Sequence, residues 1–135
     1  MPQNVKGINH IGIAVKNIEE AKKLYCEVLG FEFVEEKRLE DRKVKTVFLN
    51  SGNTTIELLE GIGEDSPVSK FIAKKGEGIH HICFVVNNIR EALKYYEEAG
   101  IPSVSKEPAP GAEGKLVSFL HPKATMGVLL EVMED

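Results

Sequence analysis

The chain contains two segments in which a strand pattern is followed directly by a helix pattern. Residues 8–15 and 79–86 are short runs rich in β-branched side chains, which favour strands. Each run is followed by an asparagine, Asn17 or Asn88, that can cap the start of a helix. Beyond each asparagine, apolar residues recur at helical spacing. We therefore expect amphipathic helices over residues 18–29 and 89–99.

The two segments are copies of one another. Aligning Gly7 with Gly78, a shift of 71 positions, gives 12 identical residues among the 21 positions of residues 7–27. About one or two identities would be expected by chance from average residue usage. An internal repeat of this kind predicts that the two halves of the chain share one local fold.

Three further strand-like segments follow the helix in each half. In the first half, the last two of these segments are joined by the turn residues 51–53. The resulting element order, βαβββ repeated twice, predicts an α+β fold. The expected strands are residues 31–36, 44–50 and 54–60 in the first half, and 103–106, 116–120 and 127–133 in the second.

A short helix is expected between the two halves. Ser66 or Asp65 can cap it, Pro67 suits its first turn, and the glycine-rich residues 76–78 end it. We interpret residues 1–135 as one domain built of two modules, at about residues 7–62 and 78–134, joined by this helical linker.

The composition is that of a soluble globular protein and excludes several functional classes. The 135 residues are 42% hydrophobic and 28% charged, and the formal net charge is −4. A negative chain without tryptophan or a basic run does not favour nucleic-acid binding. No apolar run is long enough to span a membrane, and the first residues lack a secretory pattern, so we expect a cytoplasmic protein without a membrane partner.

One histidine in each repeat lies on a strand face of small residues. Side chains alternate along a strand, so His10 shares its face with Gly12 and Ala14. The repeat aligns His10 with His81 and leaves the neighbouring His80 on the opposite face. Strand geometry and the repeat therefore select His10 and His81 as an equivalent pair.

The last strand of each half contains one glutamate among apolar residues. These residues are Glu57 and Glu131, which are 74 positions apart, three more than the shift between the helices. A buried carboxylate is costly unless it is paired, hydrogen-bonded or bound to a metal. A single strand histidine is more often a hydrogen-bonded or surface residue than a ligand, and a single strand glutamate more often faces solvent. Two of each on equivalent strands, however, suit a divalent ion with open positions for water or substrate. The predicted metal ligands are His10, Glu57, His81 and Glu131.

Paired βαβββ modules with ligands on the first and last strands resemble the vicinal oxygen chelate superfamily, whose fold is also called glyoxalase-like. Within it, the chain is similar to the methylmalonyl-CoA epimerases over nearly its whole length. The resemblance rests on INHIGIAV, GNTTIELLE and DSPVSKFIAKKGEGIHHICF, and above all on FLHPKATMGVLLEV. The DSP segment and FLHPK followed by GVLLE are the stretches most specific to the epimerases.

The resemblance implies a curved mixed sheet around a metal site and an epimerase that interconverts (2R)- and (2S)-methylmalonyl-CoA through an enolate. It places the metal ligands on the same four residues, and some relatives have glutamine at the position of Glu57. It implies cobalt as the usual ion, with Mn²⁺, Ni²⁺, Zn²⁺ or Mg²⁺ as alternatives. It also implies an acyl-CoA substrate and a homodimer.

The proton-transfer groups are assigned through the same resemblance. Glu131 is the first choice for the catalytic base, and Glu57 or a nearby acid such as Asp41 is a candidate for the second. Some relatives carry a carboxylate where this chain has Thr46, so the second base remains open. His121 and Lys123, in FLHPK, are expected to shape the substrate pocket or the CoA route, with a turn formed by His121 and the proline that follows as the alternative.

Three other functions fit parts of the pattern. A lactoylglutathione lyase of the glyoxalase type would use the same metal arrangement, but the FLHPK segment disfavours it. A metal-free module that binds small molecules would not need four ligand candidates. A structural dimerisation domain would bind no metal and turn over no substrate.

Overall fold

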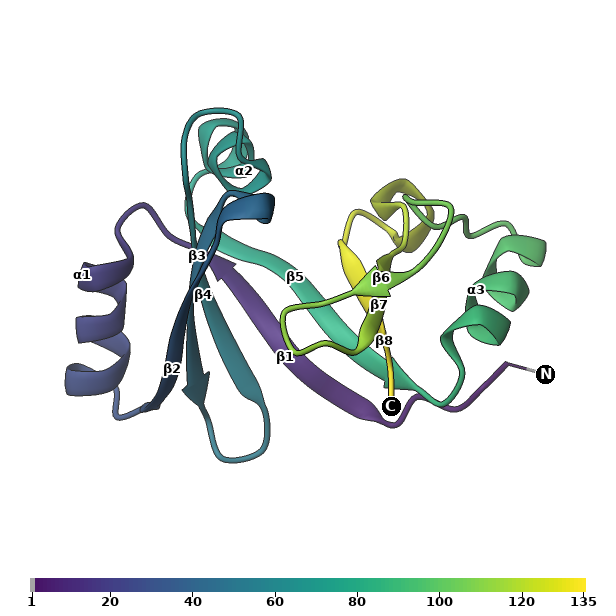
Figure 1. Cartoon of the computed structure of the whole chain (residues 1–135), viewed down its shortest axis with the longest axis horizontal. Helices are drawn as coiled ribbons and strands as arrows, with labels where there is room; N and C mark the ends of the chain where they lie inside the picture. The colour runs from purple at the N-terminus through teal and green to yellow at the C-terminus, as the bar shows by residue number, and fades with distance from the viewer. Residues whose placement is uncertain (1) are drawn as a thin grey trace. The chain divides into compact units, whose positions relative to one another are not determined.

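The computed structural model describes residues 2–135 and divides the chain into two compact units. One unit is His10–His80, and the other contains the residues up to Asn9 together with His81–Asp135. The predicted βαβββ order is confirmed in both halves (Figure 1). None of the helices in the described part of the chain has the length and apolar character needed to cross a membrane.

The first unit has the strand order β2-β3-β4-β1. Strand β1 pairs in parallel with β4, and β4, β3 and β2 are antiparallel neighbours. Helix α1 follows β1, and helix α2 follows β4 (Figure 1). The bounds of these elements are β1 Gly7–Ala14, α1 Ile18–Lys23, β2 Glu32–Leu39, β3 Val44–Asn50, β4 Thr55–Gly61 and α2 Pro67–Lys75.

The second unit repeats this arrangement with the order β5-β8-β7-β6. Strand β5 pairs in parallel with β8, and β8, β7 and β6 are antiparallel neighbours. Helix α3 follows β5 (Figure 1). The bounds are β5 Gly78–Val86, α3 Ile89–Glu98, β6 Ala109–Pro110, β7 Leu116–Phe119 and β8 Leu130–Glu134.

Each helix that follows a first strand packs its apolar side against its own sheet. Ile18 and Ala21 of α1 lie in one core cluster, and Ile89 and Ala92 of α3 lie in another. The strands supply Val47, Leu49 and Leu58 to the first cluster, and Val86 and Val132 to the second, which also contains Leu120 just after β7. Burial of these side chains is the main force that holds each helix on its sheet.

The two helix starts are capped in the same way. The side chains of Asn17 and Asn88 accept hydrogen bonds from the backbone N–H groups of Glu20 and Glu91, at 3.0 and 3.1 Å. Carboxylates from the last strands add a second cap: Glu60 accepts from the N–H of Ile18 at 2.7 Å, and Glu134 accepts from the N–H of Ile89 at 3.1 Å. These bonds satisfy N–H groups that a helix start leaves unpaired.

The first helix differs from the prediction over residues 18–29. It is α-helical only to Lys23 and continues as a π-helical turn, Leu24–Val28. The N–H of Leu29 bonds to the carbonyl of Leu24, five residues earlier, at 3.0 Å. Tyr25 and Cys26 of this wider turn pack against the first core cluster. The side-chain pattern indicated a helix, but it does not distinguish a π turn from an α turn.

The strand predicted over residues 103–106 is wrong. Ser103 makes a single bridge to Leu120, and the second unit has instead the two-residue strand β6 at Ala109–Pro110. Pro108 and Pro110 lack the N–H that a longer ladder would need, so only a short edge strand forms there.

The final strand also begins later than predicted. It starts at Leu130 rather than at residue 127, because Met126 and Gly127 have φ values of 60° and 87°. These left-handed conformations belong to the preceding turn and not to a strand. The linker helix is confirmed, with Ser66 accepting from the N–H of Val68 at 3.2 Å.

Replacing the cap of α3 should lower stability without changing the fold. Asn88→Ala removes the acceptor for the Glu91 N–H, and we expect the free energy of unfolding to fall by about 1 kcal/mol, measured by urea denaturation. Asn87→Ala changes the exposed residue before the cap and should have almost no effect. Equal losses in both variants would contradict the assigned role of Asn88.

Candidate metal centre

The first unit brings together two of the predicted ligands, His10 and Glu57. In the parallel pairing of β1 with β4, Gly12 lies beside Glu57, so the side chain of His10, two residues earlier, is on the same face. His10 and Glu57 are 4% and 7% exposed. Their Nδ1 and Oε2 atoms are 3.1 Å apart. The two side chains therefore form a buried imidazole–carboxylate pair.

The second unit brings together the other two predicted ligands, His81 and Glu131. Here Cys83 lies beside Glu131 in the pairing of β5 with β8, and His81 is again two residues earlier. Both side chains belong to residues that are 6% exposed. His81 Nε2 lies 3.3 Å from Glu131 Oε1. The two units thus contain equivalent pairs, although different ring nitrogens make the contact.

A phenylalanine lies across from the glutamate in each unit. Phe48 pairs with Glu57 in the antiparallel β3–β4 register, and Phe119 pairs with Glu131 in β7–β8. The ring of Phe119 meets that of His81 edge to face, with centroids 5.6 Å apart and planes at 83°. Phe48 and Phe119 are related by the same shift of 71 positions as the histidines, so extending the repeat to this strand would have identified them.

The longer spacing between the glutamates has a local explanation. Nine positions separate Phe48 from Glu57, whereas twelve separate Phe119 from Glu131. The additional residues belong to the connection that contains the 3₁₀ turn Pro122–Thr125. The pairing of phenylalanine with glutamate is therefore conserved between the units although the connection is longer in the second.

The donor set of these pairs is compatible with a divalent metal ion. An isolated buried carboxylate would be strongly unfavourable, and the neighbouring imidazole offsets part of that cost. His10, His81 and Glu131 are all buried and each offers a nitrogen or oxygen ligand atom, as does Glu57. Nitrogen and oxygen donors of this kind suit Zn²⁺, Co²⁺, Mn²⁺ and related ions.

Two other residues considered from the sequence have local structural surroundings. Asp41 is exposed in the 3₁₀ turn Glu40–Arg42 between β2 and β3. His121 precedes the turn that begins at Pro122, and its backbone N–H bonds to the carbonyl of Pro102 at 3.0 Å. The turn-forming interpretation of His121 agrees with this geometry.

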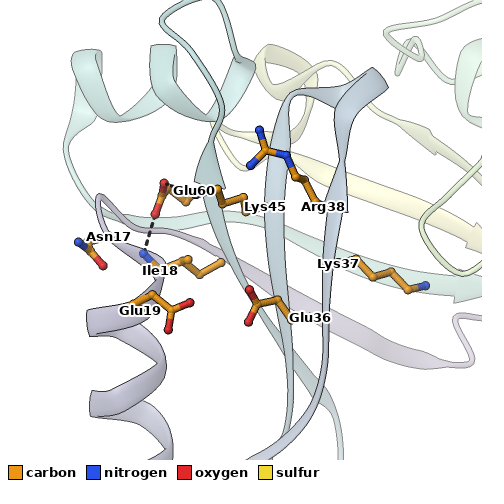
Figure 2. A pocket seen from close by; sticks show the side chains of 8 residues that line it. All are labelled: Asn17, Ile18, Glu19, Glu36, Lys37, Arg38, Lys45 and Glu60. Carbon is orange, nitrogen blue, oxygen red and sulfur yellow. Dashed lines mark hydrogen bonds and ion pairs between the residues drawn. The ribbon is translucent and has the colours of Figure 1, made fainter.

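A polar pocket of about 300 Å³ lies elsewhere in the first unit and contains none of the four predicted ligands (Figure 2). Its charged groups are engaged in ion pairs within the pocket or beside it: Lys45 Nζ is 3.6 Å from Glu60 Oε2, Glu60 also caps α1, and Glu36 pairs with Lys22. This pocket therefore has the character of a solvated ion-pair network. Its lining residues are Asn17, Ile18, Glu19, Glu36, Lys37, Arg38, Lys45 and Glu60.

The chain is therefore a protein built of two βαβββ modules. Each module contains a buried histidine–glutamate pair formed by its first and last strands. A model of the Glyoxalase/Bleomycin resistance protein/Dioxygenase superfamily matches residues 9–119, and the chain belongs to this family.

Several relatives are similar over almost the whole chain. The mitochondrial methylmalonyl-CoA epimerase of Homo sapiens is 44% identical over 130 residues, which cover 96% of this chain and 74% of the human protein. The ethylmalonyl-CoA/methylmalonyl-CoA epimerase of Cereibacter sphaeroides is 42% identical over 127 residues, covering 93% and 95%. A structure of Streptomyces coelicolor methylmalonyl-CoA epimerase in complex with 2-nitronate-propionyl-CoA is 33% identical, with a TM-score of 0.89 and coverage of 98% and 99%.

The buried pair of the first unit should show energetic coupling that an exposed pair lacks. In a double-mutant cycle of His10→Ala and Glu57→Ala, measured by urea denaturation of metal-free protein, we expect a coupling energy of about 1–3 kcal/mol. The Lys22–Glu36 pair is the control: it has a similar separation of 3.3 Å but is much more exposed, and it should give less than about 1 kcal/mol. Coupling no larger than in this control would contradict the account of the buried pair.

Proposed function

We propose that this chain is a methylmalonyl-CoA epimerase, which interconverts the (2R) and (2S) forms of its thioester substrate with the help of a divalent ion. The observation that carries the proposal is the pair of buried imidazole–carboxylate contacts, His10–Glu57 and His81–Glu131, in a chain of this family. Its similarity to epimerases in sequence and in structure supports the same reaction.

The ligands of the proposed ion are His10, Glu57, His81 and Glu131. Their burial favours a metal-bound role, because each carboxylate is removed from water and held beside an imidazole. When bound, the ion would stabilise the negative charge that develops on the substrate's thioester oxygen. We propose Co²⁺ as the native ion and a homodimer as the assembled form, in line with the family.

The chain's own groups must move the α-proton from one face of the substrate to the other. We assign the first transfer to Glu131, whose carboxylate would take the proton as the C–H bond breaks. Return of a proton to the opposite face then gives the other epimer. Glu57, the equivalent residue of the first unit, is the candidate for that second transfer, because it is the buried carboxylate related to Glu131 by the repeat.

The direct test is proton exchange into deuterated water. With methylmalonyl-CoA, the purified protein should incorporate deuterium at the α-carbon and form the opposite epimer. Chelation should abolish both signals and added Co²⁺ should restore them. Absence of exchange with every divalent ion tested would contradict the proposed function. Turnover of a hemithioacetal of glutathione in its place would support the glyoxalase alternative.

Glu131→Gln should separate catalysis from folding. The amide keeps the shape of the side chain but cannot accept a proton, so we expect turnover to fall by roughly 10²–10⁴-fold. The melting temperature should change little, because the side chain stays the same size and keeps hydrogen-bonding groups beside His81.

Glu134→Gln is the matched control on the same strand. Its carboxylate caps α3 through the Ile89 N–H, and the amide oxygen can still accept this bond but without the negative charge, so we expect a loss of at most about 1 kcal/mol of stability with turnover nearly unchanged. Comparable turnover in Glu131→Gln and in the original protein would reject the assignment of Glu131 as a base.

A further inference from the structure

Thr46, on β3, carries a buried hydroxyl that has no hydrogen-bond partner among the described residues. The residue is 1% exposed, so solvent does not replace the missing partner. Most buried polar side-chain atoms are hydrogen-bonded, and an exception of this kind requires an explanation. Valine has almost the same shape and would fill the position without burying a polar group. The hydroxyl is therefore a candidate donor to a ligand, and the face on which it lies decides which ligand it could meet.

The side chain of Thr46 lies on the same sheet face as Glu57. Thr46 pairs with Leu59 in the antiparallel β3–β4 register, and Leu59 is two residues after Glu57 on β4. Paired residues share a face, and residues two apart on one strand share a face. The side chain of Thr46 is thus diagonal to that of Glu57 across strands β3 and β4.

A cation lies next to Thr46 on this face. Lys37 of β2 pairs with Thr46 on the side away from Leu59. Its ammonium group is 5.6 Å from the ring centre of Phe48, the residue opposite Glu57, and 3.9 Å from a carboxylate oxygen of Glu35. Figure 2 shows that Lys37 extends to the other side of β2 from Glu36. The pairing of Lys37 with Thr46 therefore places a partly exposed positive charge beside a buried hydroxyl.

A hydroxyl donor beside a cation is the arrangement that binds an anionic oxygen. A threonine hydroxyl is too weak an acid to exchange protons with carbon at neutral pH, so its role is hydrogen bonding. A carboxylate has about four lone-pair sites, so one group can meet a metal ion and still accept a hydrogen bond from a hydroxyl. A carboxylate of the substrate satisfies both requirements, whereas a simple acyl thioester offers no such group.

We propose that the Thr46 hydroxyl donates a hydrogen bond to the free carboxylate of the bound 2-carboxyacyl thioester, with Lys37 contributing its positive charge. This inference rests on the proposed function and assigns to Thr46 the selection of malonyl-type thioesters over simple acyl thioesters. Thr46 orients the carboxylate and takes no part in proton transfer.

The test compares two thioesters that differ in the free carboxylate. Calorimetry with the metal-loaded protein measures the Kd of methylmalonyl-CoA and of propionyl-CoA, which lacks that group. Thr46→Val should weaken methylmalonyl-CoA binding by roughly 10- to 100-fold, the usual effect of losing a hydrogen bond to a charged group, and should leave propionyl-CoA binding unchanged. Thr46→Ser should restore most of the affinity. The melting temperature of Thr46→Val should be equal to or above that of the original protein.

Ser118 provides the matched control. Its hydroxyl is also buried and without a partner among residues 2–135, but Ser118 pairs with Val132, so it faces the α3 side of its sheet and not the side of Glu131. Ser118→Ala should leave both Kd values unchanged.

The outcomes separate this inference from the proposed function. If the original protein exchanges the α-proton but Thr46→Val binds both thioesters as before, or loses both equally, the role of Thr46 is overturned and the epimerase assignment stands. If the original protein shows no exchange and does not bind methylmalonyl-CoA, the proposed function is overturned, and the role of Thr46 with it.

Discussion

The main physical constraint on this structure is that two carboxylates are buried in apolar strands, which is costly in free energy unless each has a partner. Glu57 and Glu131 are both less than a tenth exposed, where an unpaired negative charge would be strongly destabilising. Each is held beside an imidazole, at 3.1 Å in one unit and 3.3 Å in the other. Pairing of this kind only partly offsets desolvation, so apolar residues would stabilise these positions more. The buried polar pairs are therefore not explained by stability alone, and their donor atoms are compatible with a divalent ion.

The sheet register places each histidine beside its glutamate. Parallel pairing places Gly12 beside Glu57 and Cys83 beside Glu131, so the histidine two residues earlier lies on the same face. On the opposite face, the same last strands present Glu60 and Glu134, which cap the helices α1 and α3. The last strand of each unit thus holds a glutamate of the buried pair on one face and caps a helix from the other.

Much of this organisation was predictable from the repeat and from strand alternation. The shift of 71 positions gave the βαβββ order, and alternation distinguished His81 from His80. Details that depend on backbone hydrogen bonding were not predictable. The π-helical turn at Leu24–Val28 has the side-chain pattern of an α-helix, and the short strand β6 is determined by Pro108 and Pro110 rather than by alternation.

The two buried histidine–glutamate pairs were predictable from the sequence, but their surroundings were not. The repeat makes His10, Glu57, His81 and Glu131 stand out because residues of unusual type recur at equivalent places. Thr46 does not recur in this way, and threonine is common in strands. Its significance depends on knowing that its hydroxyl is buried without a partner, which requires the positions of every neighbouring donor and acceptor.

The central proposal is that His10, Glu57, His81 and Glu131 are ligands of a divalent metal ion. The most direct measurement is the number of Co²⁺ ions bound per chain, determined by titration of the metal-free protein and of the variants His10→Ala and His81→Ala. The account predicts one ion per chain, with a large loss of affinity in either variant, because each removes a ligand of the same ion. Two ions per chain, or tight binding retained in one variant and lost in the other, would show that the pairs act separately and would contradict the account.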